Sequence, residues 1–403
     1  MHTAPFDFPP PVTYPARHVL LVCLAAFVCY LTIAIPLPVI PIFVRFTLGF
    51  PDWVVGVAVG SQFLATLATR RYAGGISDSS GGHVAVHRGL AACSVAGLAY
   101  LVAAWVPAGP LPRLLILLGG RVILGFGESL LLTGVLAWSV GLSGPARSGR
   151  AISWLGMAIY GSLAVGSPIG LWLLNTYGFA AMAVVVALIP LLGSAAIVVV
   201  PKVQPHVGEP VPFRHVVGRI WRPGVALGLQ GMGFAAIGAF VSLYFTAEQW
   251  DWAGLALSAF GGMFVLARIL FGNLPDRLGG ARVALRFFVV EAAGQLVLAL
   301  ASNATMALIG AALTGFGCSM IFPSLGVETV RLVPAKSRGT ALGAFAAFQD
   351  VAYGLTGPVA GLVAGMYGYA SVFFIGTGAA VLGLFMTLPL LPRKTDVRQG
   401  ETS

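Results

Sequence analysis

The chain is a succession of apolar blocks, most of them about twenty residues or longer, separated by short polar breaks. A block of that length crosses the roughly 30 Å hydrocarbon core of a bilayer as one helix. Charged residues make up 9% of the 403 residues, whereas a soluble domain carries about 25%. Because so few charges cannot cover a soluble fold of this size, we expect an all-α membrane protein.

Twelve apolar blocks predict twelve transmembrane helices. The first block is too long for the apolar core of a signal peptide, and a proline-rich segment without a basic start precedes it, so we expect it to be retained. The expected spans are 18–46, 52–72, 86–107, 112–141, 150–173, 178–200, 223–247, 253–274, 282–302, 304–330, 338–364 and 369–392.

Lys and Arg collect on one side of this arrangement. All of the 23 basic residues except Arg45, Arg113, Arg121 and Arg268 fall on the side that holds both termini. Basic loops mark the cytoplasmic side, so we expect both termini in the cytoplasm. The same distribution accounts for the net charge of +10 without nucleic acid as a partner; anionic lipid headgroups of the bilayer suit it better.

A long polar segment divides the predicted helices six and six. The resulting units are a cytoplasmic tail at 1–17, a six-helix bundle at 18–200, a cytoplasmic linker at 201–222, a second six-helix bundle at 223–392 and a cytoplasmic tail at 393–403.

The two bundles repeat short sequences in the same order. Parallel six-helix repeats are typical of transporters. The repeated pairs are GGISDSSGG at 74–82 with GNLPDRLGG at 272–280, LGFGESLLLTG at 124–134 with TGFGCSMIFPSLG at 314–326, and GSPIG at 166–170 with TGPVAG at 356–361.

These repeats resemble motifs of the major facilitator superfamily along the whole chain. The family's loop signature is matched at Gly272, Leu274, Asp276, Arg277 and Gly279, with a thinner copy at Gly74, Asp78 and Gly81. Its fourth-helix motif is matched at Arg121, Gly125 and Gly127, and its glycine-proline motif at Gly354, Gly357, Pro358 and Gly361 with a looser copy containing Gly166 and Pro168.

More narrowly, the runs YLTIAIPLPVIPIFV, RVILGFG and GRAISWLG are similar to the YhhS-like bacterial inner-membrane exporters, a group associated with sugar efflux or drug resistance. The resemblance implies a bacterial inner membrane, a monomer and transport by alternating access. It also implies that the loop signatures act as conformational latches and the glycine-proline segments as helix bends. Asp78 is expected to meet Arg338 or the start of the eleventh helix, where the positive helix end favours an anion; helix termination and plain packing are the alternatives.

Five ionisable residues lie deep inside predicted spans, away from the span ends, where each is costly: Arg121, Glu128, Arg268, Glu291 and Asp350. Arg121 and Glu128 are seven residues apart and therefore share a helix face. Glu128 is a candidate proton carrier, because its surroundings control how firmly a carboxyl group holds a proton, and Arg121 is its candidate partner. Asp350 is a rival carrier with Arg268 as partner. Fixed ion pairs between helices are the alternative, and we expect Glu291 to pair with nearby Arg286.

The resemblance implies that the first, fourth, seventh and tenth helices line a central cavity. Aromatic and amide side chains there suit an amphiphilic organic substrate. The cavity candidates are Tyr30, Thr32, Gln230, Phe234, Tyr244 and Ser319, together with Gln349 beside Asp350.

Other functional classes lack their motifs. No P-loop, H-E-x-x-H or G-x-S-x-G is present, and the cysteines and histidines lack metal-ligand spacing. We therefore expect no cofactor, metal or enzyme activity, and a proton-coupled exporter of a small organic solute. Uptake of such a solute, by facilitation or with protons, and export of an anionic metabolite or metal chelator remain open.

Overall fold

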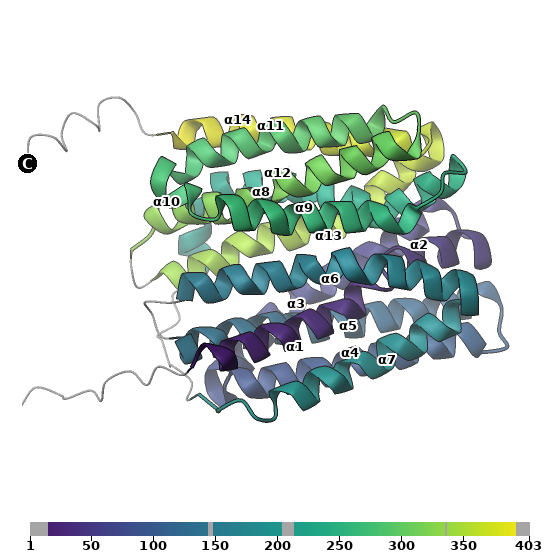
Figure 1. Ribbon diagram of the computed structural model, residues 1–403, viewed down its shortest axis with the longest axis horizontal. Coiled ribbons are helices and arrows are strands. Elements are labelled where there is room, and N and C mark those ends of the chain that lie inside the picture. The colour runs from purple at the N-terminus through teal and green to yellow at the C-terminus, as the bar shows by residue number, and fades with distance from the viewer. Residues whose placement is uncertain (1–14, 144–147, 204–212, 335–336, 392–403) are drawn as a thin grey trace, which may run out of the picture.

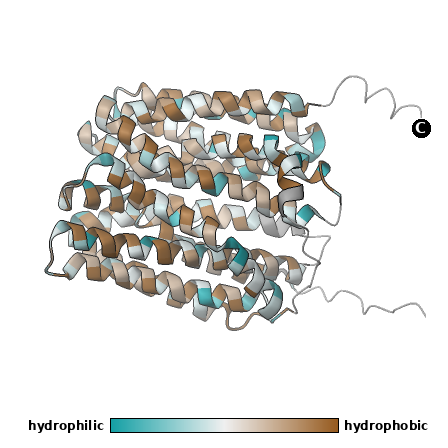
Figure 2. Cartoon of the chain, turned by 180° about the vertical axis from the view of Figure 1, so that it is seen from behind, coloured by the Kyte–Doolittle hydropathy of each residue, from teal (hydrophilic) through white to brown (hydrophobic). Residues whose placement is uncertain are grey.

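A computed structural model describes residues 15–143, 148–203, 213–334 and 337–391. These residues form a bundle of long helices with no strand among them, which confirms the all-α expectation (Figure 1). Apolar residues run along most of the length of the helices (Figure 2).

The first half contains six membrane-crossing segments. The first is interrupted where Pro36 and Pro38 break the helix, so that α1 continues into a short α2 and a π-helical turn, η1. The segments are α1 (Ala16–Ala34) with α2 (Val39–Ile42) and η1 (Phe43–Thr47), α3 (Asp52–Ser80), α4 (Gly82–Trp105), α5 (Pro110–Ser143), α6 (Ser148–Tyr177) and α7 (Phe179–Ile197).

The second half contains six more, and one short helix. They are α8 (Phe213–Ala247), α9 (Ala253–Phe271), the short α10 (Leu274–Leu278), α11 (Gly280–Ala299), α12 (Ala304–Arg331), α13 (Arg338–Tyr367) and α14 (Ala370–Thr387), which ends in a 3-10 turn, η4 (Leu388–Leu390). Within the described residues, ten segments are long and apolar enough to cross a membrane. The other two, α11 and α13, lie among them in the bundle (Figure 1).

The two halves lie side by side, with α1 to α7 below and α8 to α14 above in the view of Figure 1. Both ends of the described chain lie at one end of the bundle, as an even number of crossings requires. We call this the terminal end and the opposite one the distal end. Helix α3 therefore begins at the distal end and α13 reaches that end at Tyr367.

Two helices extend well beyond their expected spans. Helix α3 runs eight residues past position 72, to Ser80, and α8 begins at Phe213, ten residues before position 223. In the second half the segment matching the end of α3 breaks after Phe271, because Pro275 lacks the N–H needed to continue the helix and starts α10 instead. Ser77 occupies the matching position in α3 and allows it to continue.

The halves touch closely where α3 passes α13 near the distal end. A Cβ atom added to Gly56 would overlap the Gly357 carbonyl group, and one added to Gly60 would overlap that of Gly354. Gly361 approaches the backbone of Asp52 in the same way. Glycine at these positions therefore allows direct backbone contact between the halves.

A second distal contact joins α6 to α9. The Ser258 hydroxyl donates to the Ala164 carbonyl oxygen at 2.7 Å, and the Ser167 hydroxyl donates to that of Gly254 at 3.1 Å. These bonds satisfy polar groups that hydrocarbon would otherwise leave unpaired.

The terminal ends of α3 and α13 are not in such contact. A Cβ atom at Gly74 or Gly75 of α3, or at Gly339 or Gly343 of α13, would meet no atom within 4 Å. Close glycine contacts between α3 and α13 are therefore found toward the distal end, and these four glycines of the terminal end make none.

We expect Gly56→Ala to open the distal end. The added methyl group overlaps the Gly357 backbone, and overpacking of this kind costs about 1–3 kcal/mol. Spin labels at the exposed distal positions Gly109 and Ser302 should move apart. Gly339→Ala, where the methyl group meets open space, is the matched control; equal distances in both variants would contradict the prediction.

Candidate functional site

Glu128 projects from the middle of α5 toward α3. Its Oε2 accepts hydrogen bonds from Gln62 Nε2 at 2.8 Å and from the Thr66 hydroxyl at 3.0 Å. Gly125 makes this approach possible, since a Cβ atom there would overlap the Gln62 backbone. The carboxyl group is almost fully buried, and both donors that hold it are neutral.

Arg121 shares the face of Glu128 but does not bind it, so the expected ion pair is wrong. Arg121 Nε donates to the Ala58 carbonyl oxygen and its Nη2 to that of Val59, both at 2.9 Å. Seven residues of helix separate the two side chains by roughly 10 Å, and each finds a nearer partner on α3. Arg121 is fully buried and joins two helices of one half.

Asp350 forms an ion pair with Arg70, which links α13 to α3 and so one half to the other. The expected partner, Arg268, is elsewhere. Asp350 is 9% exposed and Arg70 24% exposed at their side chains. Arg70 also acts electrostatically on Glu128. Arg70 therefore contacts Asp350 directly and acts on Glu128 only at longer range.

Arg268 lies on α9 of the second half, in contact with Phe264 and Ser319. Its Nη2 donates to the Ser319 carbonyl oxygen at 2.7 Å, and its guanidinium carbon lies 5.3 Å from the centre of the Phe264 ring. The Ser319 hydroxyl donates to the Phe264 carbonyl oxygen at 2.8 Å. Within the described residues Arg268 has no carboxylate partner, so its positive charge is compensated only by a carbonyl and an aromatic face.

Aromatic rings from both halves meet next to these charges. Tyr160 stacks on Phe264 with ring centres 3.5 Å apart, while Phe234 lies 5.1 Å and Phe63 5.0 Å from the ring of Tyr353. The hydroxyl groups of Tyr160 and Tyr353 are 3.5 Å apart. We call these five residues the aromatic cluster. Among the expected cavity residues, only Phe234 belongs to it.

The other cavity candidates divide into two groups. Gln349 Nε2 donates to Gln230 Oε1 at 3.0 Å beside the aromatic cluster, and the Tyr30 hydroxyl lies in the electrostatic field of Glu128. Thr32 bonds instead to the Cys29 carbonyl oxygen of its own helix. Tyr244 donates to the Ala301 carbonyl oxygen at the distal end, so Tyr244 lies outside the site.

The expected latch is not closed in this structure. Asp78, Asp276, Arg277 and Arg338 are exposed, and none of these described side chains forms an ion pair. Asp78 near the end of α3 and Arg338 at the start of α13 are both exposed at the terminal end and do not pair.

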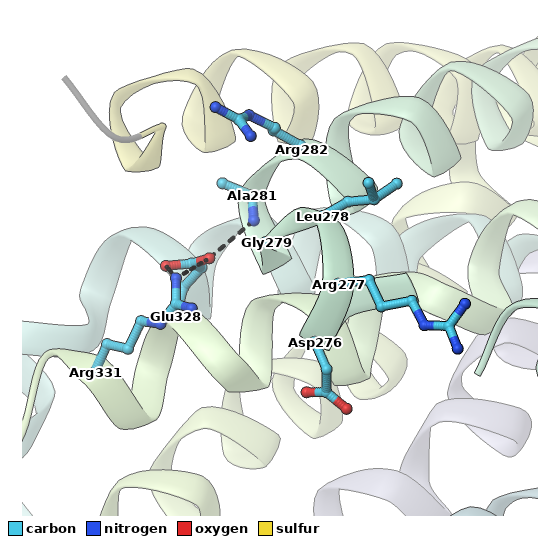
Figure 3. Close-up of a pocket in the computed structure, with 8 residues that line it drawn as sticks. All are labelled: Asp276, Arg277, Leu278, Gly279, Ala281, Arg282, Glu328 and Arg331. Carbon is cyan, nitrogen blue, oxygen red and sulfur yellow. Dashed lines mark hydrogen bonds and ion pairs between the residues drawn. The ribbon is translucent and has the colours of Figure 1, made fainter. Parts of the chain in front are cut away.

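Another carboxylate occupies the helix end in the second half. Glu328 of α12 accepts a hydrogen bond from the Ala281 N–H at 2.9 Å, at the first turn of α11, and Arg331 pairs with it at 3.2 Å (Figure 3). Asp276 points away from this contact. Gly280 permits it, because a Cβ atom there would lie 2.8 Å from Glu328 Oε1.

The glycine-proline motifs serve contacts within and between the halves. Gly166 packs against Ala34 of α1, while Pro168 meets Gly254 of α9 across the halves. Gly357, Pro358 and Gly361 form the α13 side of the distal contact.

The distal contact also holds a polar cluster. Asp52 accepts a hydrogen bond from the Tyr369 hydroxyl at 2.8 Å and pairs with Arg45 at 3.2 Å. Burial and the bond to Asp52 raise the pKa of Tyr369 to about 12. The hydroxyl therefore remains a donor well above its ordinary pKa of 10.0, so this bond between the halves is lost only as pH rises through the higher value.

Our sequence analysis missed three residues that make the site: Gln62, Thr66 and Arg70. Their spacing of four residues puts them on one face of α3, which was the available signal. Arg70 lies two residues from the end of the predicted span 52–72 and was counted with the basic residues of the cytoplasmic side. Glu291 is also misassigned: it is fully buried, whereas Arg286 is exposed and does not pair with it.

The described part of the chain contains no cluster of metal-ligating side chains. No group of three or more His, Cys, Asp or Glu residues there is arranged to hold a metal ion. The four cysteines, Cys23, Cys29, Cys93 and Cys318, are free and buried.

Comparison with known proteins gives consistent matches along the whole chain. The family model for the Major Facilitator Superfamily matches residues 22–253 and again 224–403. An uncharacterized MFS-type transporter of Salmonella typhimurium is 48% identical over 359 residues, which cover 89% of this chain and 92% of the relative. A similarly described protein of Burkholderia pseudomallei is 43% identical over 371 residues, covering 91% and 90%.

Solved structures share the fold. A D-xylose-proton symporter superposes with a TM-score of 0.78 at 16% identity, covering 94% of this chain and 98% of that one. A mutant of the nucleoside transporter NupG superposes with a TM-score of 0.74 at 15% identity, covering 93% and 100%.

Proposed function

This chain belongs to the major facilitator superfamily, and we propose that it exports a small organic solute in exchange for protons. Membership makes it a secondary transporter rather than an enzyme. The direction of transport, the coupling to protons and the solute are proposals, as is the more specific relationship to the YhhS-like exporters.

The buried Glu128 carries this proposal. Its carboxyl group lies near mid-bundle and is held only by the neutral donors Gln62 and Thr66, so it accepts a proton without breaking an ion pair. Arg70, one helical turn beyond Thr66, is already paired with Asp350. We propose that the single guanidinium group of Arg70 is shared between the two carboxyl groups, and that the carboxyl group without it takes the proton.

The aromatic cluster supports an organic solute with an apolar face. Tyr160, Phe234 and Tyr353 offer ring faces, and the amides of Gln230 and Gln349 offer hydrogen bonds. Few precisely placed polar groups among apolar ones are typical of small-molecule sites. A sugar, a drug or a metabolite fits this chemistry; an anionic metabolite or chelator would engage Arg268.

We place the terminal end in the cytoplasm of a bacterial inner membrane, because the basic loops lie at that end, and we propose that the protein works as a monomer. The structure then corresponds to the state closed toward the periplasm. In that state a solute enters from the cytoplasm, and the latch residues Asp78 and Arg338 come together only after the halves rock to the opposite state.

Everted membrane vesicles test the direction and the coupling together. Respiration acidifies their interior, and an exporter exchanges added solute for internal protons. We expect a sugar, a cationic drug or an anionic metabolite to raise the internal pH, measured with a pH-sensitive dye, only in vesicles that contain the protein. Solute-driven acidification would instead indicate symport and uptake. Solute entry that leaves the internal pH unchanged would overturn proton coupling.

A further inference from the structure

Glu291 is a carboxyl group that the central site does not use. It lies on α11 and is fully buried, and its Oε1 accepts a hydrogen bond from the Cys318 thiol of α12 at 3.4 Å. Its Oε2 has no hydrogen-bond partner. No Lys, Arg or His of the described residues pairs with it.

Among the described residues, no charged side chain lies against the Glu291 carboxyl group, and α14, which also packs on α11, carries no titratable side chain. On α8 the nearest group is Gly233, where a Cβ atom would lie 2.8 Å from Glu291 Oε1. On α12 the Glu291 backbone packs against Gly317, and Cys318 is the only titratable neighbour. Gln295, one turn further along α11, is occupied by its bond to the Gly233 carbonyl oxygen at 2.9 Å.

An ionised carboxylate without a counter-charge is very costly in such a place. The group must therefore carry a proton or a bound cation. A hard metal cation requires several oxygen ligands, whereas the neighbours of the Glu291 carboxyl group are a thiol and a glycine. The chemistry of the site favours a proton.

A purely structural acid would have both oxygens satisfied. The unpartnered Oε2 forfeits a hydrogen bond, which costs about 1–3 kcal/mol for a buried polar atom. Helix α8 packs against the Glu291 carboxyl group at Gly233. The same helix carries Gln230 and Phe234 of the central region. Movement of α8 during rocking therefore changes the surroundings of Glu291.

Polar groups connect Glu291 with the central site. The Cys318 thiol that binds Glu291 also interacts with the Gln230 side chain. Gln230 in turn accepts a hydrogen bond from Gln349, which precedes Asp350 in α13. This line crosses from α11 through α12 and α8 to α13.

We propose that Glu291 is a second proton-binding site, in the C-terminal half, that exchanges its proton with the central site along Cys318, Gln230 and Gln349. When α8 shifts, water enters beside Gln230, takes the proton as the O–H bond of Glu291 breaks, and hydrates the carboxylate that remains. The Asp350 carboxylate receives the proton from that water when Arg70 leaves it for Glu128. Proton binding at Glu291 does not depend on the proposed export. Only the role of this proton as a second coupling proton rests on the proposed function.

Infrared spectroscopy tests this without knowledge of the solute. The purified protein in lipid should show a protonated carboxyl C=O band at neutral pH that disappears in Glu291→Gln and remains in Glu128→Gln. On transfer to deuterated water the band should shift within the time of the measurement. Gln230→Leu and Cys318→Ala should slow that shift at least about tenfold, equivalent to about 1.4 kcal/mol, while leaving the band itself in place.

Three outcomes overturn the proposal. A band that never shifts in deuterated water identifies a structural acid that does not exchange. A band that appears only when sodium is removed identifies a cation site. A band unaffected by Glu291→Gln shows that Glu291 is not the protonated group. Since none of these readings requires transport, failure of the proposed export leaves them interpretable.

Discussion

We expect Glu128→Gln to abolish proton-driven accumulation of solute while exchange of solute for solute continues. Glutamine keeps the size of the side chain, and its carbonyl oxygen still accepts from Thr66. The unpartnered Gln62 Oε1 provides an acceptor for the new amide after rotation of the Gln62 side chain. The variant therefore keeps the contact between α5 and α3 but loses the only group there that titrates.

The measurement uses proteoliposomes with an imposed pH gradient and, separately, with solute on both sides. The gradient-driven rate should fall by about 100-fold or more, as expected when a positioned proton carrier is lost. Thr66→Val is the matched control, because it removes one hydrogen bond to Glu128 but keeps the carboxyl group. Normal gradient-driven transport by Glu128→Gln would transfer the coupling role to Asp350.

Removing either partner of the Arg70–Asp350 pair should be more harmful than removing both. Each single change, Arg70→Gln or Asp350→Asn, leaves one charge largely buried without its partner, which costs up to about 3–5 kcal/mol for a fully buried pair. The cost should be smaller here because Arg70 is 24% exposed. The double variant leaves two neutral amides that can bond to each other, and should recover most of the stability.

Thermal unfolding in detergent measures this coupling through a double-mutant cycle. Transport should not recover in the double variant, because Arg70 is then absent from Glu128 as well. Arg338→Gln, which removes an exposed cation without an ion pair in this state, serves as the control for charge alone. Additive losses in the cycle would show that the pair contributes little to joining the halves.

The helices were predictable because the bilayer imposes a length and an apolar composition on each one. The limits of α3 and α8 were not, because their extra turns carry polar residues that lie at the terminal end, where hydropathy does not distinguish a helix from a loop. Pro275 and Ser77 occupy matching positions in the two halves. The helix breaks before Pro275 and continues through Ser77, so one residue decides the outcome.

The candidate site was predictable by residue type but not by pairing. Glu128 and Asp350 were conspicuous as carboxyl groups in apolar sequence, yet their partners come from α3. Helix periodicity relates residues within one helix and says nothing of which neighbour a face meets. Arg121 shares a helix face with Glu128, as the spacing of seven residues predicts. It nevertheless bonds to backbone carbonyl oxygens of α3 and not to Glu128.

The glycine contacts between α3 and α13 limit which conditions can weaken the distal contact between the halves. These contacts join uncharged backbone groups. Their strength should therefore depend little on salt concentration or on the membrane potential. Asp52 and Tyr369 add a hydrogen bond whose donor persists far into alkaline conditions. The strength of the distal contact should therefore vary little with conditions. In the proposed mechanism, the changes that open it come from the proton and the solute binding at the charged groups of the central site.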